Sequence, residues 1–331
     1  MKASELQATL EAMVLEKIPT FVWGAPGIGK SSIVKQIADT LEYEFIDLRL
    51  SLMDPTDLKG IPFYNEEKHT AMWAPPAFLP REGKGILFLD ELNSAPPSVQ
   101  ASAYQLILDR CVGEYELPEG WSIIAAGNRE TDRGVVYKMS APLANRFVHL
   151  EMDVNTDDWR EWAYKKGIDV SIIAYLTCKK EKLFEFDPSV NTKTFATPRS
   201  WEFVDKVVKS PLSSTLLLET ISGAIGRDTA IDYLSFAKVA SQLPDIESIL
   251  HKGEGELVED VEVLYVLISA LISSYLSDPQ ERYLENLLQY SLKIESEFSV
   301  LMIQELQRYG VDMHESKNFE PWIEKFAYLL A

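Results

Sequence analysis

The chain has 331 residues, of which 46% are hydrophobic, and a formal net charge of −19 at pH 7. This apolar content excludes a disordered protein, and the length exceeds what a single core usually holds, so two or three packed units are expected. The acidic balance disfavours a surface that grips nucleic-acid backbones nonspecifically, because such a surface is usually basic. Only two cysteines occur, without C-x-x-C spacing, which indicates a reducing cytoplasm.

The first residues predict an amphipathic surface helix. Leu6, Leu10, Met13 and Val14 recur at helical spacing with acids between them, and no secretory leader pattern precedes the first apolar run. The longest apolar stretch, residues 263–276, is interrupted by serines and is too short to cross a bilayer. We therefore expect a cytoplasmic protein without a membrane span.

Residues 24–31 form a complete G-x-x-x-x-G-K-[ST] phosphate loop. An apolar run at residues 20–23 precedes the loop, and a helical pattern follows it, so the loop lies at a strand-to-helix turn. There, backbone N–H groups and the helix N-terminus can surround phosphate oxygens, Lys30 adds a charge, and the Ser31 hydroxyl can ligate Mg²⁺. The predicted nucleotide-binding residues are Gly24, Ala25, Pro26, Gly27, Ile28, Gly29, Lys30, Ser31 and Ser32.

Two short hairpins are predicted in the connections between the strands that follow the phosphate loop. Residues 54–60 are expected to form a capped helical turn, followed by a hairpin of residues 61–64 and 70–73. A second, shorter hairpin is expected between residues 111 and 121.

The strand before the second hairpin ends in two adjacent acids, Asp90 and Glu91. At the carboxyl edge of a parallel sheet, Asp90 would hold Mg²⁺ beside Ser31, and Glu91 would polarise the attacking water. Having both acids favours a nucleoside triphosphate hydrolase over a protein that only binds the nucleotide.

Three further polar residues complete the predicted site. Asn128 follows the buried run at residues 122–126 and can orient the lytic water. Arg146 lies at a helix end just before the last strand, on the domain rim, where it can reach a neighbouring subunit's γ-phosphate. Arg199 lies in the first turn of a helix that opens with Thr197 and Pro198.

Five short apolar runs alternate with helical patterns up to about residue 150, which is typical of a parallel sheet covered on both faces. They are residues 20–23, 44–48, 86–89, 122–126 and 147–150. From about residue 155 the pattern is helical throughout. We predict an α/β nucleotide-binding domain at residues 1–152 with an insert near 54–75, a helical lid at 153–250, and a C-terminal helical extension at 251–331.

The order of these motifs resembles the AAA+ ATPases, and within them the MoxR-like, dynein-related branch with a helix-2 insert. The resemblance covers about residues 15 to 240 and implies a P-loop NTPase fold that uses ATP and Mg²⁺. It makes Asn128 the sensor 1 residue, Arg146 the arginine finger and Arg199 the sensor 2 residue. Arg129 and Arg133, which flank the strand that ends in Asn128, are rival finger candidates.

The resemblance also implies a ring, most simply a homo-hexamer, whose hairpins face a central pore. Ile61, Phe63, Tyr64 and Tyr115 either contact a client there or pack the hairpins onto the core. The expected function is remodelling of a protein client, with a von Willebrand A-type protein or an immature metalloenzyme as partner.

Other classes stay open. A nucleic-acid motor resembling GTP-driven restriction subunits would need a basic pore, which the acidic charge disfavours. A metal-chelatase motor subunit has similar motifs. A nucleotide-gated switch with negligible turnover is the third alternative, against which Glu91 argues.

Overall fold

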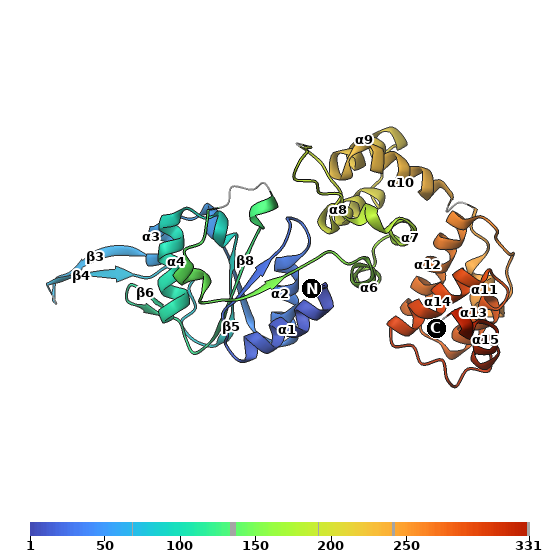
Figure 1. The fold of residues 1–331 in the computed structure, drawn as a ribbon, viewed down its shortest axis with the longest axis horizontal. Helices are drawn as coiled ribbons and strands as arrows, with labels where there is room; N and C mark the ends of the chain where they lie inside the picture. The colour runs from blue at the N-terminus through green and yellow to red at the C-terminus, as the bar shows by residue number, and fades with distance from the viewer. Residues whose placement is uncertain (68, 133–136, 191, 240–241, 330–331) are drawn as a thin grey trace. The chain divides into compact units, whose positions relative to one another are not determined.

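A computed structural model of the chain describes residues 1–67, 69–132, 137–190, 192–239 and 242–329. These residues form two compact units (Figure 1). The first comprises Met1–Asn155 with Pro188–Val190, and the second comprises Thr156–Asp187 and Asn191–Ala331.

A five-stranded parallel sheet in the order β2-β5-β8-β1-β9 forms the centre of the first unit. Its strands are β1 (Thr20–Trp23), β2 (Glu44–Arg49), β5 (Lys84–Asp90), β8 (Gly120–Gly127) and β9 (Val148–Glu151). The α/β fold and all five predicted strands are confirmed, with ends that move by one or two residues. The strand β1, which delivers the phosphate loop, lies between β8 and β9.

Helices cover both faces of the sheet (Figure 1). On one face lie α1 (Ala3–Leu15), whose buried side chains are Leu6, Leu10 and Val14, and α2 (Lys30–Thr40). On the other lies α4 (Pro97–Asp109), which starts with proline at its first position and buries Val99, Ala103 and Leu106. The shorter elements are α3 (Pro55–Lys59), α5 (Ala141–Ala144) and the 3₁₀ turns η1 (Leu50–Leu52), η2 (Leu92–Ser94) and η3 (Glu130–Asp132).

Both predicted hairpins are present, but their aromatic side chains differ in environment. The first, β3 (Ile61–Asn65) with β4 (Thr70–Ala74), extends away from the sheet (Figure 1), and Ile61, Phe63 and Tyr64 are exposed. In the second, β6 (Cys111–Val112) with β7 (Tyr115–Glu116), Tyr115 is buried and its hydroxyl donates to the Pro80 carbonyl oxygen at 2.7 Å. Tyr115 therefore packs its hairpin onto the core, so the alternative that it contacts a client is wrong.

The second unit is built from helices, as predicted. They are α6 (Thr156–Lys166), α7 (Val170–Cys178), η4 (Lys180–Leu183), α8 (Pro198–Val208), α9 (Ser214–Ile225), α10 (Arg227–Val239), α11 (Ile246–Lys252), α12 (Val261–Ser277), α13 (Glu281–Ser291), α14 (Ser296–Arg308), α15 (Phe319–Phe326) and η6 (Ala327–Leu329). Leucine, isoleucine and aromatic side chains of α11 to α15 form one continuous core. Within the described residues, every helix is too short or too polar to span a bilayer.

Candidate nucleotide-binding site

The phosphate loop connects the end of β1 at Trp23 to the start of α2 at Lys30. Gly29, the residue before α2, has a φ of +102°, which side chains other than glycine rarely adopt, and this conformation turns the chain into the helix. At the other end of the loop, the Gly24 amide donates to the Gly127 carbonyl oxygen of β8 at 3.3 Å. The loop is thus fixed to two neighbouring strands at the carboxyl edge of the sheet, with the N-terminus of α2 beneath it.

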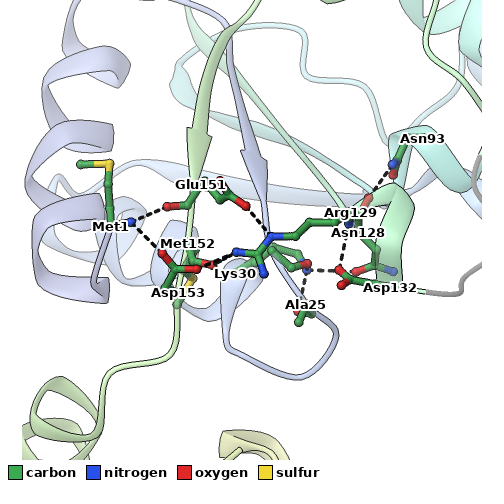
Figure 2. Close-up of polar contacts among 11 residues, drawn as sticks. Met1, Ala25, Lys30, Asn93, Asn128, Arg129, Asp132, Glu151, Met152 and Asp153 are labelled. Carbon is green, nitrogen blue, oxygen red and sulfur yellow. Dashed lines mark hydrogen bonds and ion pairs between the residues drawn. The ribbon is translucent and has the colours of Figure 1, made fainter. Parts of the chain in front are cut away.

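Lys30 points its ammonium group back across this loop. Its Nζ donates to the carbonyl oxygens of Gly24 at 2.6 Å and Ala25 at 3.0 Å, and to Asn128 Oδ1 at 3.1 Å (Figure 2). The structure therefore brings the phosphate-loop lysine into direct contact with the amide predicted to orient the lytic water. A bound γ-phosphate would compete with these oxygens for the lysine charge.

The two predicted acids lie at the end of β5. Asp90 is the last residue of the strand, and its Oδ1 accepts from the Glu91 amide at 2.9 Å. Glu91 has a φ of +56°, a left-handed conformation that is unfavourable for a residue other than glycine and that often marks functional sites. Its Oε2 accepts a short hydrogen bond from the hydroxyl of Ser51, which follows β2.

Negative charge accumulates at this edge. Partial burial and the neighbouring Asp47 carboxylate raise the pKa of Asp90, while the Glu91 amide and the Lys30 ammonium act against that rise. Burial also raises the pKa of Asp47 on β2, opposed by Arg49 and reinforced by Glu91. The carboxylates of Asp47 and Glu91 thus lie close enough to Asp90 to raise its pKa, at a place where a cation would relieve the repulsion.

The chemistry of these donors fits Mg²⁺ bound together with phosphate. No cluster of three or more His, Cys, Asp or Glu side chains suited to holding a metal occurs among the described residues. Magnesium commonly takes one or two protein ligands and completes its shell with substrate phosphates and water. Ser31, in the first turn of α2, and Asp90, at the end of β5, are the residues that would hold it.

Two residues that the sequence analysis missed contact this site. Besides Ser51, Asn93 in η2 donates from Nδ2 to the Asn128 carbonyl oxygen at 2.7 Å (Figure 2). Both are polar residues close to predicted strand ends, Ser51 after β2 and Asn93 three positions after Asp90. That placement is the sequence feature that could have identified them.

The candidate finger arginines have different surroundings. Arg129 is ion-paired within its own unit, through Nε to Glu151 at 2.5 Å and through Nη2 to Asp153 at 2.6 Å (Figure 2). Arg146 follows α5 and precedes the edge strand β9; its side chain is exposed and has no ion pair among the described residues. Arg133 lies outside the described residues.

Arg199 belongs to the second unit. It lies in the first turn of α8, which begins as predicted with Thr197 as N-cap and Pro198 at the first position. Thr197 Oγ1 accepts from the Ser200 amide at 3.0 Å, and the Arg199 side chain is exposed. The local conformation agrees with the expectation, and the role of Arg199 toward phosphate stays a prediction.

Comparison with known proteins supports this interpretation of the first unit. Residues 20–149 match the sequence model of the ATPase family associated with various cellular activities (AAA). The protein MoxR of Methylorubrum extorquens is 27% identical over 131 residues, which cover 38% of this chain and 37% of MoxR. The matched segment thus spans little more than a third of MoxR.

The solved structures that resemble this chain are more distant in sequence. The Holliday junction branch migration motor RuvB of Thermotoga maritima is 19% identical, with a TM-score of 0.39, covering 85% of this chain and 86% of RuvB. NtrX of Brucella abortus, solved in complex with ADP, is 14% identical with a TM-score of 0.42, covering 97% of this chain and 67% of NtrX. Residues 20–149 thus match the AAA family of ATPases, and over this part of the sequence the chain is similar to MoxR.

Proposed function

We propose that the protein is an Mg²⁺-dependent ATPase that works as an oligomeric ring and remodels a protein partner. The observation that carries the proposal is the meeting of Lys30, Asn128 and the Asp90–Glu91 pair at one edge of the sheet. Lys30 and the loop amides would bind the phosphates, Asn128 would orient water, and Glu91 would accept its proton. Bound Mg²⁺ would neutralise charge on the β- and γ-phosphates.

The ring follows from the finger arginine. Arg146 lies beside the edge strand β9, exposed and without an ion pair among the described residues, whereas Arg129 is paired to Glu151 and Asp153. An arginine on the rim completes a site only when a second copy presents its phosphates. By this argument Arg146, rather than Arg129, is the finger, and a homo-hexamer is the assembly that the resemblance favours.

The β3–β4 hairpin is the proposed contact with the partner. Ile61, Phe63 and Tyr64 expose 72%, 46% and 62% of their surface on a two-stranded element that pairs with no other strand among the described residues. Exposed aromatic and aliphatic side chains on an unpartnered hairpin favour contact with another protein. A von Willebrand A-type protein is the partner class that the resemblance suggests.

The test is turnover of ATP beside GTP by the wild type and by Glu91→Gln. The general base contributes about 10²- to 10⁴-fold, so Glu91→Gln should lose at least about 100-fold in kcat while still binding nucleotide. Adding double-stranded DNA or a candidate von Willebrand A-type protein separates the remaining alternatives. Stimulation by the protein supports the proposal; stimulation by DNA alone, or equal turnover by Glu91→Gln, contradicts it.

A further inference from the structure

Asn93 is a buried amide that none of the predicted catalytic or nucleotide-binding roles accounts for. It lies in η2, three residues after Asp90, and exposes only 1% of its surface. Polar side chains buried to this extent normally keep at least one hydrogen-bond partner, because burying one without any partner is unfavourable. Its contacts therefore indicate what the protein gains by keeping an amide there.

The donor end of this amide holds the segment predicted to orient water. Asn93 Nδ2 donates to the backbone carbonyl oxygen of Asn128 at 2.7 Å, and the side chain of Asn128 in turn accepts from Lys30 Nζ at 3.1 Å. Figure 2 shows Asn93 and Lys30 on different sides of Asn128. The turn that follows the acids is thereby connected through Asn128 to the phosphate loop.

The acceptor end fits closely against the residue before Asn128. A Cβ built on Gly127 would lie 2.1 Å from Asn93 Oδ1, so the amide and any larger residue at 127 exclude each other. Asn93 Oδ1 is itself buried without a hydrogen-bond partner in the described part of the chain. In addition, the Asn93 carbonyl oxygen accepts from the Tyr137 amide at 2.7 Å, which fixes η2 itself.

We propose that Asn93 is a positioning residue for hydrolysis: it fixes the backbone of Asn128 so that the Asn128 amide stays aimed at the phosphate loop and the attacking water. This inference rests on the proposed ATPase function. Asn93 touches no reacting atom, and its effect is transmitted through Asn128. Loss of the contact should therefore reduce the rate of the chemical step much more than nucleotide binding.

Asn93→Asp tests the donor with little change of shape, since it replaces Nδ2 by oxygen. We expect kcat for ATP to fall about 10- to 100-fold, because small displacements of catalytic groups have effects of that size, while KM changes less than about threefold. Gln100→Glu is the matched control. Gln100 is also a buried amide of this segment, and its Nε2 donates to the Ala95 carbonyl oxygen at 3.0 Å, away from Asn128. Gln100→Glu should keep kcat within about threefold of the wild type.

The double-mutant cycle with Asn128→Ala separates positioning from a merely structural role. If Asn93 acts through Asn128, then Asn93→Asp should have no further effect on kcat once the Asn128 amide is gone. An equal loss in both backgrounds, or a Gln100→Glu variant as slow as Asn93→Asp, would overturn the proposal.

A second pair tests the contact without reference to turnover. Gly127→Ala should lower the melting temperature, and Asn93→Ala should restore part of that loss, because removing Asn93 Oδ1 makes room for the new methyl group. Absence of any rescue would contradict the packing on which the inference depends. A wild type that fails to hydrolyse ATP would refute the proposed function, whereas an active wild type matched by Asn93→Asp would refute the role of Asn93 alone.

Discussion

Asp90, the proposed ligand of Mg²⁺, is a residue that we expect to lower the stability of the folded protein. The carboxyl of Asp90 is partly buried beside Asp47 and Glu91, and burial together with Asp47 raises its pKa. For an acid whose folded pKa lies above the unfolded value, the folded state binds protons more tightly. The free energy of unfolding therefore falls as pH rises from the unfolded pKa, about 3.9 for aspartate, through the folded value.

Asp90→Asn should accordingly stabilise the protein at pH 7.5 in the absence of Mg²⁺ and nucleotide. A gain on the order of 1 kcal/mol is expected, the usual size for a single stabilising substitution. The gain should vanish near pH 3, where the carboxyl is largely protonated in both states. Melting curves at the two pH values measure it, with the exposed Asp109→Asn as control. Destabilisation of Asp90→Asn at pH 7.5 would contradict the electrostatic argument.

At the scale of elements, the two hairpins predict opposite responses to mutation. Phe63 and Tyr64 on β3 are exposed, whereas Tyr115 on β7 is buried and bonded to Pro80. Phe63→Ser with Tyr64→Ser should change the free energy of unfolding by less than about 0.5 kcal/mol, as surface substitutions do. Tyr115→Ala should lower it by about 3 kcal/mol, in the range of buried aromatic truncations. Denaturant titration distinguishes the two, and equal losses would refute the burial difference.

In the second unit, a buried ion pair connects the first helix of its sequence, α6, to α14 near the end of the chain. Arg160 on α6 and Glu305 on α14 expose 2% and 3% of their surface, and Arg160 Nη2 lies 2.8 Å from Glu305 Oε1. Burial raises the pKa of Glu305 despite the opposing charges of Arg160 and Arg308. Desolvation thus outweighs attraction, which is the usual situation of buried pairs.

Breaking this pair should therefore be worse than replacing it. Arg160→Met alone should destabilise the unit by about 3 to 5 kcal/mol, and adding Glu305→Leu should recover most of the loss. The exposed pair of Lys165 and Glu161 on the same helix is the control, since Lys165→Met should change stability by less than about 0.5 kcal/mol. A double variant that recovers none of the stability lost in Arg160→Met would contradict this expectation.

The elements of the sheet could be predicted because each strand is a local apolar run between turns, and such runs do not depend on distant residues. The phosphate loop and Asp90 were likewise readable from residue order. The sequence could not predict which polar side chains from different strand ends contact each other. Ser51 reaches Glu91 over 40 positions and Asn93 reaches Asn128 over 35, contacts created only by the order of strands in the sheet. For the same reason the residue order at 111–121 left open whether Tyr115 faces the core.

At the scale of the whole molecule, the proposed chemistry needs more than one copy of the chain. Glu91 and Lys30 belong to the site of one protomer, whereas the exposed Arg146 beside edge strand β9 would complete the site of its neighbour. An arginine finger contributes about 10³- to 10⁵-fold to kcat, so Arg146→Ala should be almost inactive even though its own phosphate loop is intact.

Mixing two inactive variants tests whether the catalytic site is shared between protomers. In an equimolar mixture of Glu91→Gln and Arg146→Ala, about a quarter of the sites in randomly assembled rings would pair an intact Glu91 with an intact Arg146 from the neighbour. ATP turnover should then return to about a quarter of the wild-type rate, although neither variant alone is active. A mixture that stays inactive, or an Arg146→Ala variant that hydrolyses ATP normally by itself, would contradict a site shared between protomers.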